Sequence, residues 1–369
     1  MDVNAACAVR RILRTMPHPD WTRQAVRALE AEAHRSADTH LIRLDLAAFP
    51  GIALYLKDES THPTGSLKHR LARSLFLYAL CNGWLHEGQA VIEASSGSTA
   101  ISEAYFARLL GLPFHAVMPR CTSPDKIAQI EAFGGHCQLI DGTDVYSAAQ
   151  ALAVRLGGHY MDQFTHAERA TDWRGNNNIA ESIFRQMQLE PEPVPRWIVA
   201  SAGTGGTSAT LGRYLRYRGL PTQLAVADPE HSVFAAFHRT GDAHLRCERG
   251  SRIEGIGRPR VEPSFLPGVI DRMIEVPDAA SVAALGCLEQ LLGRRVGGST
   301  GTHLVAALKL MCQMREAGQT GPVVTLICDG GERYRASYYN EAWLAAEGLD
   351  VAPERTRLDA ILADGQWLD

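Results

Sequence analysis

The chain has 369 residues, of which 46% are hydrophobic and 21% are charged, and its net charge is −4. At roughly 100–200 residues per domain, this length suggests two or three domains, with enough apolar material for a sizeable core. The near-neutral charge argues against a polybasic nucleic-acid binder, and the apolar content argues against an intrinsically disordered chain.

The sequence has none of the usual membrane, metal or disulfide patterns. No run approaches the roughly 20 apolar residues that span a bilayer, and the N-terminal region has no continuous apolar segment typical of a secretory signal. The eight cysteines are scattered without a C-x-x-C pair, and the fourteen histidines form no H-x-x-x-H or H-E-x-x-H pair. We therefore expect a cytoplasmic protein with reduced thiols, no membrane contact and no metal site.

Strands and helices are predicted to alternate along most of the chain. Residues 1–44 read as a polar, helix-prone extension that packs on the core. Residues 52–59 alternate like a strand, residues 62–66 form a turn with Pro and Gly, and residues 67–81 have the apolar spacing of a helix. Further strands are expected at 89–95, 113–119, 136–141, 196–202, 223–229 and 322–329, and further helices at 99–110, 123–135, 146–156, 178–188, 207–218, 279–292 and 302–316.

This alternation determines the predicted fold class. Strands separated by single helices imply right-handed βαβ units and hence parallel sheets. We therefore predict an α/β fold with two doubly wound parallel-sheet domains. The N-terminal domain is placed at residues 45–165 and the C-terminal domain at 166–340, with a peripheral tail at 341–369.

The first chemical motif is the glycine-rich turn G-T-G-G-T (Gly203–Thr207), which follows a predicted strand and opens a predicted helix. Backbone N–H groups at such a turn form a cradle for a phosphate. The turn lacks the G-K-[ST] of a P-loop, and Ser208 stands where a G-x-G-x-x-G motif would have its last glycine. Asp228 ends the next strand, so a nicotinamide site is the rival interpretation. An ordinary glycine-rich turn without a ligand is the third.

The second motif is S-S-G-S-T (Ser95–Thr99), another turn from a strand into a helix. It offers backbone amides and several hydroxyls at a helix N-terminus, a combination that suits a small carboxylate. The alternative is a capped helix start, because Ser and Thr are favoured N-caps.

The third motif is the lysine of P-T-G-S-L-K (Pro63–Lys68) at the start of a predicted helix. The helix dipole and burial both disfavour a charged amine there and lower its pKa. A neutral lysine amine can form a Schiff base with a carbonyl cofactor. The chain has only four lysines, Lys57, Lys68, Lys126 and Lys309, and a solvated lysine is the alternative interpretation of this one.

A phosphate cradle, a carboxylate cradle and an activated lysine are together what pyridoxal phosphate chemistry on an amino acid requires. The chain resembles the fold-type II pyridoxal phosphate enzymes, which include the tryptophan synthase β subunit, and within them the cysteine synthase/cystathionine β-synthase family. The resemblance runs from about Leu41 to Tyr338. Besides G-T-G-G-T and S-S-G-S-T, the matching motifs are K-D-E-x-x-x-P-T-G-S-x-K (Lys57–Lys68), M-P-x-x-x-S-x-x-K-I (Met118–Ile127), A-F-G-G (Ala132–Gly135), D-Q-F (Asp162–Phe164) and G-E-R-Y (Gly331–Tyr334).

The resemblance implies a homodimer that uses pyridoxal 5'-phosphate on a small L-amino acid. Lys68 would hold the cofactor as a Schiff base and act as the catalytic group, with the lysine and the substrate loop in the N-terminal domain and the phosphate loop in the C-terminal domain. The implied cofactor-binding residues are Lys68, Ser98, Gly203, Thr204, Gly205, Gly206, Thr207 and Asp329, and the implied substrate-binding residues are Ser95, Ser96, Gly97, Thr99, Gln163 and Gly255.

The chain departs from the family pattern at three places. Ser98 replaces the asparagine that hydrogen-bonds the cofactor's ring hydroxyl, and Gly330 replaces the serine near the pyridine nitrogen. Either nothing contacts that nitrogen directly or the adjacent Asp329 does. The usual Asn-Pro-rich loop after Gln163 is replaced by T-H-A-E-R-A-T-D-W-R-G-N-N-N.

The replaced loop and Ser98, together with E-G-I-G-R-P (Glu254–Pro259) and G-G-S-T-G-T (Gly297–Thr302), resemble the L-cysteine desulfhydrase branch. The expected reaction is β-elimination on L-cysteine, a carbon–sulfur lyase reaction that releases hydrogen sulfide, pyruvate and ammonia. The alternative within the family is β-replacement, in which an O-activated serine reacts with sulfide or another nucleophile. A nicotinamide oxidoreductase is a more distant alternative, because it leaves Lys68 and the S-S-G-S-T loop without a role.

Overall fold

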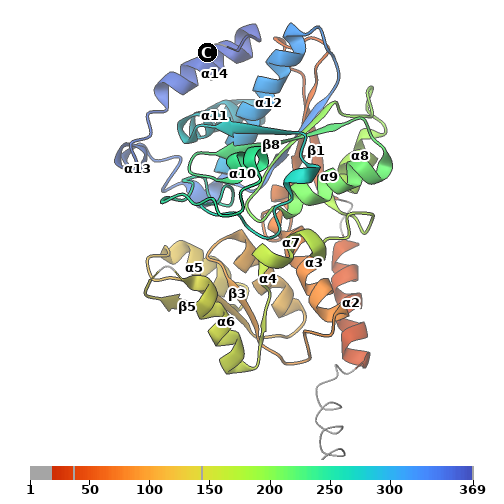
Figure 1. The fold of residues 1–369 in the computed structure, drawn as a ribbon, viewed down its shortest axis with the longest axis vertical. Helices are drawn as coiled ribbons and strands as arrows, with labels where there is room; N and C mark the ends of the chain where they lie inside the picture. The colour runs from red at the N-terminus through yellow and green to blue at the C-terminus, as the bar shows by residue number, and fades with distance from the viewer. Residues whose placement is uncertain (1–18, 36–37, 143, 368–369) are drawn as a thin grey trace, which may run out of the picture. The chain divides into compact units, whose positions relative to one another are not determined.

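A computed structural model describes residues 19–35, 38–142 and 144–367 of the chain (Figure 1). Contacts between residues divide the chain into two compact units. The smaller unit contains the described part of Met1–Ala37 together with Leu71–Gln163, and the larger unit contains the described part of Asp38–Arg70 and Phe164–Asp369. Each unit has its own sheet, so the two sheets that the sequence predicts are both present.

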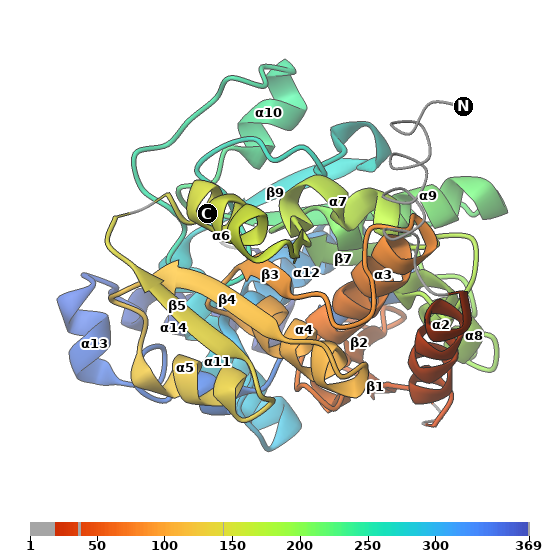
Figure 2. The ribbon, with the colours of Figure 1, turned by 90° about the horizontal axis from the view of Figure 1, so that it is seen from below.

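The smaller unit is built on a parallel four-stranded sheet with the order β5-β4-β3-β6. Figure 2 shows β3, β4 and β5 side by side. All four residues of β3 are buried, as expected for a strand covered on both faces. The elements are α2 (Pro19–Ala33), most of α3 (Lys68–Cys81), β3 (Val91–Ala94), α4 (Ser98–Leu109), β4 (Phe114–Pro119), α5 (Pro124–Glu131), β5 (His136–Ile140), α6 (Val145–Leu156) and β6 (His159–Tyr160).

The larger unit is built on a six-stranded sheet with the order β1-β2-β10-β7-β8-β9. Only the edge strand β1 runs antiparallel to its neighbour, and the other pairs are parallel. The strands are β1 (His40–Leu44), β2 (Leu54–Asp58), β7 (Trp197–Ser201), β8 (Gln223–Pro229), β9 (Arg272–Val276) and β10 (Val323–Ile327). The helices are α7 (Gln163–Ala170), α8 (Ile179–Met187), α9 (Gly206–Arg218), α10 (Phe234–Thr240), α11 (Asp278–Leu292), α12 (Gly298–Glu316), α13 (Glu341–Ala346) and α14 (Ala352–Asp364), with the short 3-10 helices η1 (Glu59–Thr61), η2 (Pro267–Val269) and η3 (Gly331–Tyr334).

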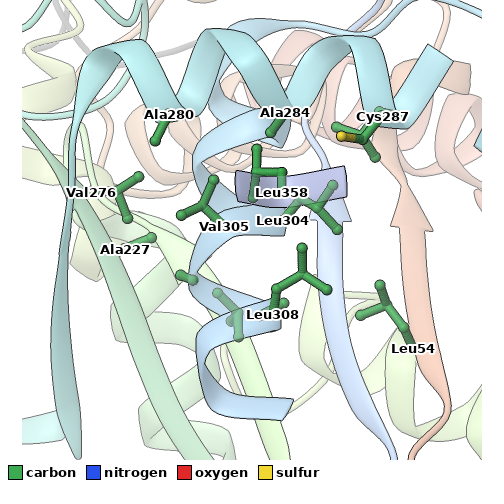
Figure 3. Packing of buried hydrophobic residues seen from close by; sticks show 14 of the residues in the cluster. Leu54, Ala227, Val276, Ala280, Ala284, Cys287, Leu304, Val305, Leu308 and Leu358 are labelled. Carbon is green, nitrogen blue, oxygen red and sulfur yellow. The ribbon is translucent and has the colours of Figure 1, made fainter. Parts of the chain in front are cut away.

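Two apolar layers cover the two faces of the larger sheet. Because successive strand residues point to opposite faces, Leu54 and Leu56 of β2 join one core while Tyr55 joins the other. The first core contains α11, α12 and α14, and the second contains α8 and α9. Figure 3 shows part of the first core, where Leu304 and Leu308 of α12 lie among residues of α11, α14 and the sheet. The sheet is therefore doubly wound, as the alternating pattern predicts.

The domain boundary differs from the one predicted from the sequence. Residues 45–165 were expected to form one domain that contains Lys68. In the structure β2 pairs with β1 and with β10, so Asp38–Arg70, including Lys68, belongs to the larger unit. The predicted N-terminal extension, residues 1–44, contributes α2 to the smaller unit and β1 to the larger, and its residues 1–18 lie outside the described residues. Strand pairing between segments far apart in sequence cannot be read from local patterns.

The C-terminal segment also differs from expectation. Residues 341–369 were predicted to form a peripheral tail, yet α14 packs on the larger unit. Leu358 and Ile361 of this helix are 1% and 0% exposed and belong to the same core as α11 and α12. The last helix is therefore part of the fold. The sequence analysis gave weight to the acidic composition of this segment and not to its few apolar positions.

We expect Leu358→Ala to lower the free energy of unfolding by about 2–5 kcal/mol, because it removes buried methyl groups and leaves a cavity in the core. Urea unfolding of the variant and the original protein measures this difference. Leu189→Ala is the matched control, since Leu189 is 96% exposed and its truncation should change stability by less than about 0.5 kcal/mol. Equal small effects for both variants would contradict a core role for α14.

Candidate active site

Three neighbouring strands of the larger unit end at the same edge of its sheet. The parallel strands stand in the order β2, β10, β7, and the segments that follow them carry Lys68, Asp329 and the turn Gly203–Thr207. The Leu67 N–H donates to the Cys328 carbonyl at 2.9 Å, which holds the lysine segment beside the end of β10. In open α/β sheets, ligands bind outside the carboxyl ends of such strands. The edge therefore brings together the sequence-predicted groups of this unit.

Lys68 is the first residue of α3 and is partly buried. Burial lowers the pKa of its amine, and the positive charge of Arg258 acts in the same direction. Cys328 and Asp329 oppose this shift, but the net direction remains downward. The structure therefore agrees with the expectation of an amine that loses its proton more easily than a solvated lysine.

Two arginines hold the turn and the helix start around Lys68. Arg333 of η3 donates to the Thr64 carbonyl at 2.7 Å, which joins the G-E-R-Y motif to the P-T-G-S turn. Arg70 donates to Glu59 at 2.6 Å through Nε and to the Asn177 carbonyl at 2.7 Å. Because these charged groups are mostly buried and paired, the position of the lysine backbone is tightly constrained.

The glycine turn Gly203–Thr207 leads from β7 into α9 and is packed so closely that side chains would not fit. Gly205 has a φ of +89°, and a Cβ atom there would lie 2.6 Å from the Ser264 carbonyl oxygen. A Cβ atom at Gly203 would overlap the Gly255 carbonyl oxygen. The glycines therefore let neighbouring backbone segments pack closely against the turn. A turn of this kind before a helix N-terminus presents backbone N–H groups that can bind an anion.

Gly255, which the family resemblance implies to be a substrate-binding residue, lies beside this glycine turn. Its φ is +85°, and the Gly257 N–H donates to the Ala202 carbonyl at 2.8 Å. The turn around Gly255 is therefore pinned to the strand end that carries Gly203.

Asp329 is buried at the end of β10, with one oxygen paired and one not. The Tyr334 hydroxyl donates to Oδ2 at 2.7 Å, whereas Oδ1 has no hydrogen-bond partner within the described part of the chain. Burial raises the pKa of this carboxyl to about 6. The unpaired oxygen could accept a hydrogen bond from a bound group, so a role for Asp329 toward a cofactor ring remains a prediction. Gly330 beside it has no side chain to offer.

The smaller unit brings the S-S-G-S-T loop and Gln163 together. The loop follows β3 and Gln163 follows β6, and these two strands are parallel neighbours. The Thr99 hydroxyl donates to Gln163 Oε1 at 2.8 Å, and the Gly97 N–H donates to Ser95 Oγ at 3.2 Å. Ser95, Ser96 and Ser98 are partly buried around the N-terminus of α4. This arrangement of hydroxyls and amides can bind a carboxylate.

Sequence reasoning missed two buried carboxyl groups below this loop. Glu93 in β3 and Glu103 in α4 are both 0% exposed. Glu93 accepts the N–H groups of Ala94 at 2.7 Å and Gln163 at 3.2 Å, so it contacts both parts of the carboxylate-binding arrangement. The available signal was an acidic residue in each of two otherwise apolar segments.

Asp228 does not support the nicotinamide interpretation. Its side chain is 1% exposed, and Oδ2 accepts the Ala235 N–H at 2.8 Å at the start of α10. A carboxylate that binds a ribose must reach the ligand. This one is covered, with Oδ2 held by the Ala235 N–H and Oδ1 buried without a hydrogen-bond partner among the described residues.

Comparisons with known proteins identify the family of the chain. A family model described as pyridoxal-phosphate dependent enzyme matches residues 34–329. The chain is 59% identical to L-cysteine desulfhydrase Cds1 of Mycobacterium tuberculosis over 372 residues, covering 100% of both chains. It is 29% identical to a putative cysteine synthase of Sinorhizobium fredii, covering 80% of this chain and 86% of the relative.

Solved structures show the same architecture. O-ureido-L-serine synthase matches with a TM-score of 0.71 and 26% identity, covering 83% of this chain and 96% of that one. The O-acetylserine dependent cystathionine beta-synthase from Helicobacter pylori matches with a TM-score of 0.70 and 25% identity, covering 84% and 97%. The solved structures have the fold-type II architecture that the sequence predicts. Because the family model matches most of its length, the chain belongs to the family of pyridoxal-phosphate dependent enzymes.

Proposed function

We propose that this pyridoxal-phosphate dependent enzyme is an L-cysteine desulfhydrase, a lyase that cleaves the carbon–sulfur bond of L-cysteine and releases hydrogen sulfide, pyruvate and ammonia. The observation that carries this proposal is the 59% identity with L-cysteine desulfhydrase Cds1 over the full length of both chains. The groups around Lys68 and the S-S-G-S-T loop support it chemically.

The residues of the larger unit fit pyridoxal 5'-phosphate. The amides and hydroxyls of Gly203–Thr207 would hold the phosphate, at a turn where side chains would clash with neighbouring backbone. Lys68 would form the Schiff base, and the unpaired oxygen of Asp329 is available for a donor on the ring. When bound, the cofactor acts as the electron sink that delocalises the negative charge developing at the substrate α-carbon.

Lys68 would carry the proton transfers. Burial lowers the pKa of its amine, which favours the neutral form that can remove the α-proton. Ser95, Ser96, Thr99 and Gln163 would bind the substrate carboxylate and so orient the α-proton. Gly97 gives this loop its backbone turn, and its N–H is held by Ser95.

Elimination suits a thiol substrate because its sulfur leaves as hydrosulfide, a stable anion, as the acidity of thiols indicates (the pKa of a cysteine thiol is about 8.5). Release to pyruvate then needs only a proton from Lys68 and water. A β-replacement synthase must also retain the substrate fragment until a second nucleophile arrives. Cysteine synthase activity is the second candidate, favoured by the relatives that bear that name. Ser98, which replaces the family asparagine, favours elimination because it is shorter and restrains the cofactor less.

We also propose a cytoplasmic homodimer. In the described residues, no helix has the length and apolar composition required to cross a membrane. The dimer is supported by the family resemblance, and sedimentation of the holoenzyme measures it directly.

Lys68→Ala should abolish covalent attachment of the cofactor, because no other amine would take its place. Borohydride reduction followed by peptide mapping should label the peptide containing Lys68 in the original protein and no peptide in the variant. Lys309→Ala is the control and should keep the label. A label on Lys57 or Lys126 would show that the Schiff-base assignment is wrong.

L-cysteine should give pyruvate and sulfide faster than O-acetylserine and sulfide give cysteine. Product analysis with each substrate measures the two rates, and Ser98→Asn should shift the ratio toward cysteine by fixing the cofactor ring more firmly. Efficient cysteine formation with little pyruvate would establish the synthase instead. An unchanged ratio in Ser98→Asn would show that this position does not control the partition.

Gly205→Ala should weaken binding of pyridoxal phosphate by roughly tenfold or more, because the Cβ atom and the positive φ force the phosphate turn to move. Titration of the cofactor into cofactor-free protein, followed by absorbance, gives the dissociation constant. Gly250→Ala is the control, since a Cβ atom there meets nothing within 4 Å. Equal affinities for both variants would argue against this turn as the phosphate site.

A further inference from the structure

Two buried carboxyl groups lie directly behind the S-S-G-S-T loop of the smaller unit. Glu93 is the third residue of β3, and Glu103 is on α4, four residues after Thr99 and therefore on the same helix face. Both side chains are 0% exposed. The elements that carry the two carboxyls are thus the strand that enters the loop and the helix that leaves it.

Glu93 connects the loop to Gln163. One oxygen accepts the Ala94 N–H at 2.7 Å, just before the loop, and the other accepts the Gln163 N–H at 3.2 Å. Gln163 in turn accepts the Thr99 hydroxyl through its side chain. A displacement of the Glu93 carboxyl would therefore move both sets of groups assigned to the substrate carboxylate.

The Glu103 carboxyl is buried without a hydrogen-bond donor among the described residues. The group that acts on it most strongly besides burial is the Glu93 carboxyl, whose charge raises the pKa of Glu103. Two carboxylates cannot share a hydrogen bond unless one carries a proton, and two buried like charges in contact strongly disfavour each other. Burial of both carboxyls therefore favours a protonated pair, and Glu103, which accepts no N–H group, is better placed to carry the proton than Glu93, which accepts two.

The surroundings keep that proton in place. Tyr160 of β6 and Asp162 face the pair, and Tyr146 of α6 lies beside Tyr160, so the neighbouring groups are neutral or acidic. Burial raises the pKa of Glu93 to about 8, and burial together with Glu93 raises the pKa of Glu103 well above its usual range.

We propose that Glu103 is a positioning residue for substrate binding, and that it acts as a protonated carboxyl that donates to Glu93 and so holds the S-S-G-S-T loop and Gln163 in their binding arrangement. This inference rests on the proposed role of the loop in binding an amino-acid carboxylate. It does not depend on which bond the enzyme then breaks.

Three variants separate this role from a merely structural one. Glu103→Gln keeps the shape and supplies an N–H donor to Glu93, but it cannot ionise. Glu103→Leu removes the donor and leaves Glu93 without a partner on that side. Glu131→Gln, an exposed acid on α5, is the matched control.

Binding of L-alanine to the holoenzyme tests the proposal without turnover, because L-alanine has the amine and carboxylate but no β-leaving group. The change in absorbance of the bound cofactor gives its dissociation constant. At about pH 7 we expect Glu103→Gln and Glu131→Gln to bind like the original protein, and Glu103→Leu to bind roughly tenfold more weakly. With L-cysteine, the same loss should appear mainly in KM.

The pH dependence provides the second readout. A carboxyl whose pKa is higher in the folded than in the unfolded state stabilises the fold below the unfolded value, and this contribution is lost as pH rises through the folded pKa. Between about pH 7 and about pH 9.5, the original protein should therefore lose more Tm, and about tenfold more L-alanine affinity, than Glu103→Gln. In Glu103→Gln the amide favours the ionised form of Glu93, so this alkaline loss should be reduced.

Two results would overturn the proposal: Glu103→Leu that folds and binds L-alanine like the original protein, or Glu103→Gln that keeps the full alkaline loss of Tm and affinity. If Glu103→Leu does not fold, the comparison between Glu103→Gln and the original protein still decides. Failure of the desulfhydrase assignment is separate, because an enzyme that binds L-alanine but makes no pyruvate from L-cysteine leaves the role of Glu103 intact.

Discussion

Parallel pairing of β2, β10 and β7 places the ends of three distant chain segments at one edge of the larger sheet. Within the strands, backbone N–H and C=O groups are used by the ladders, so ligand-binding groups come from the residues just beyond the last pair. Asp329 and the amides of Gly203–Thr207 occupy these positions. Lys68 comes later, after η1 and the P-T-G-S turn, and the Leu67 N–H bond to the Cys328 carbonyl holds its segment beside the end of β10. The smaller unit has the same arrangement: the S-S-G-S-T loop follows β3, Gln163 follows the parallel neighbour β6, and the two are joined by a hydrogen bond.

Desolvation is the second force that shapes the chemistry. It lowers the pKa of the Lys68 amine and raises the pKa of the Asp329 carboxyl, so each group moves toward its neutral form. A lysine that loses its proton readily can act as base and nucleophile, whereas an exposed one would remain charged. Burial likewise raises the pKa of Glu93 and Glu103 beside the S-S-G-S-T loop, so it favours their protonated forms.

Several family motifs act through contacts with one another. Arg333 of G-E-R-Y donates to the P-T-G-S turn, and Gly255 of the E-G-I-G segment packs against Gly203 of the phosphate turn. These contacts explain why motifs spread over most of the chain occur together, since each supports the position of another. The segment after Gln163, where the chain departs from the family, forms α7, and Ala167 of that helix lies against Gly206. The departure thus includes a residue that packs against the turn Gly203–Thr207.

The sequence by itself determined the element types and the parallel α/β class, because periodicity and turn residues are local properties. The same local patterns predict the chemistry of Lys68, the turn Gly203–Thr207 and the loop Ser95–Thr99, whereas Gln163 was predicted from the resemblance to the family. Only the tertiary structure decided that Lys68 belongs with the C-terminal sheet, that α14 completes the core, and that Glu93 and Glu103 are both buried. These features depend on which strands pair and which faces pack, and that choice is made by contacts between residues far apart in the chain, which no local pattern records.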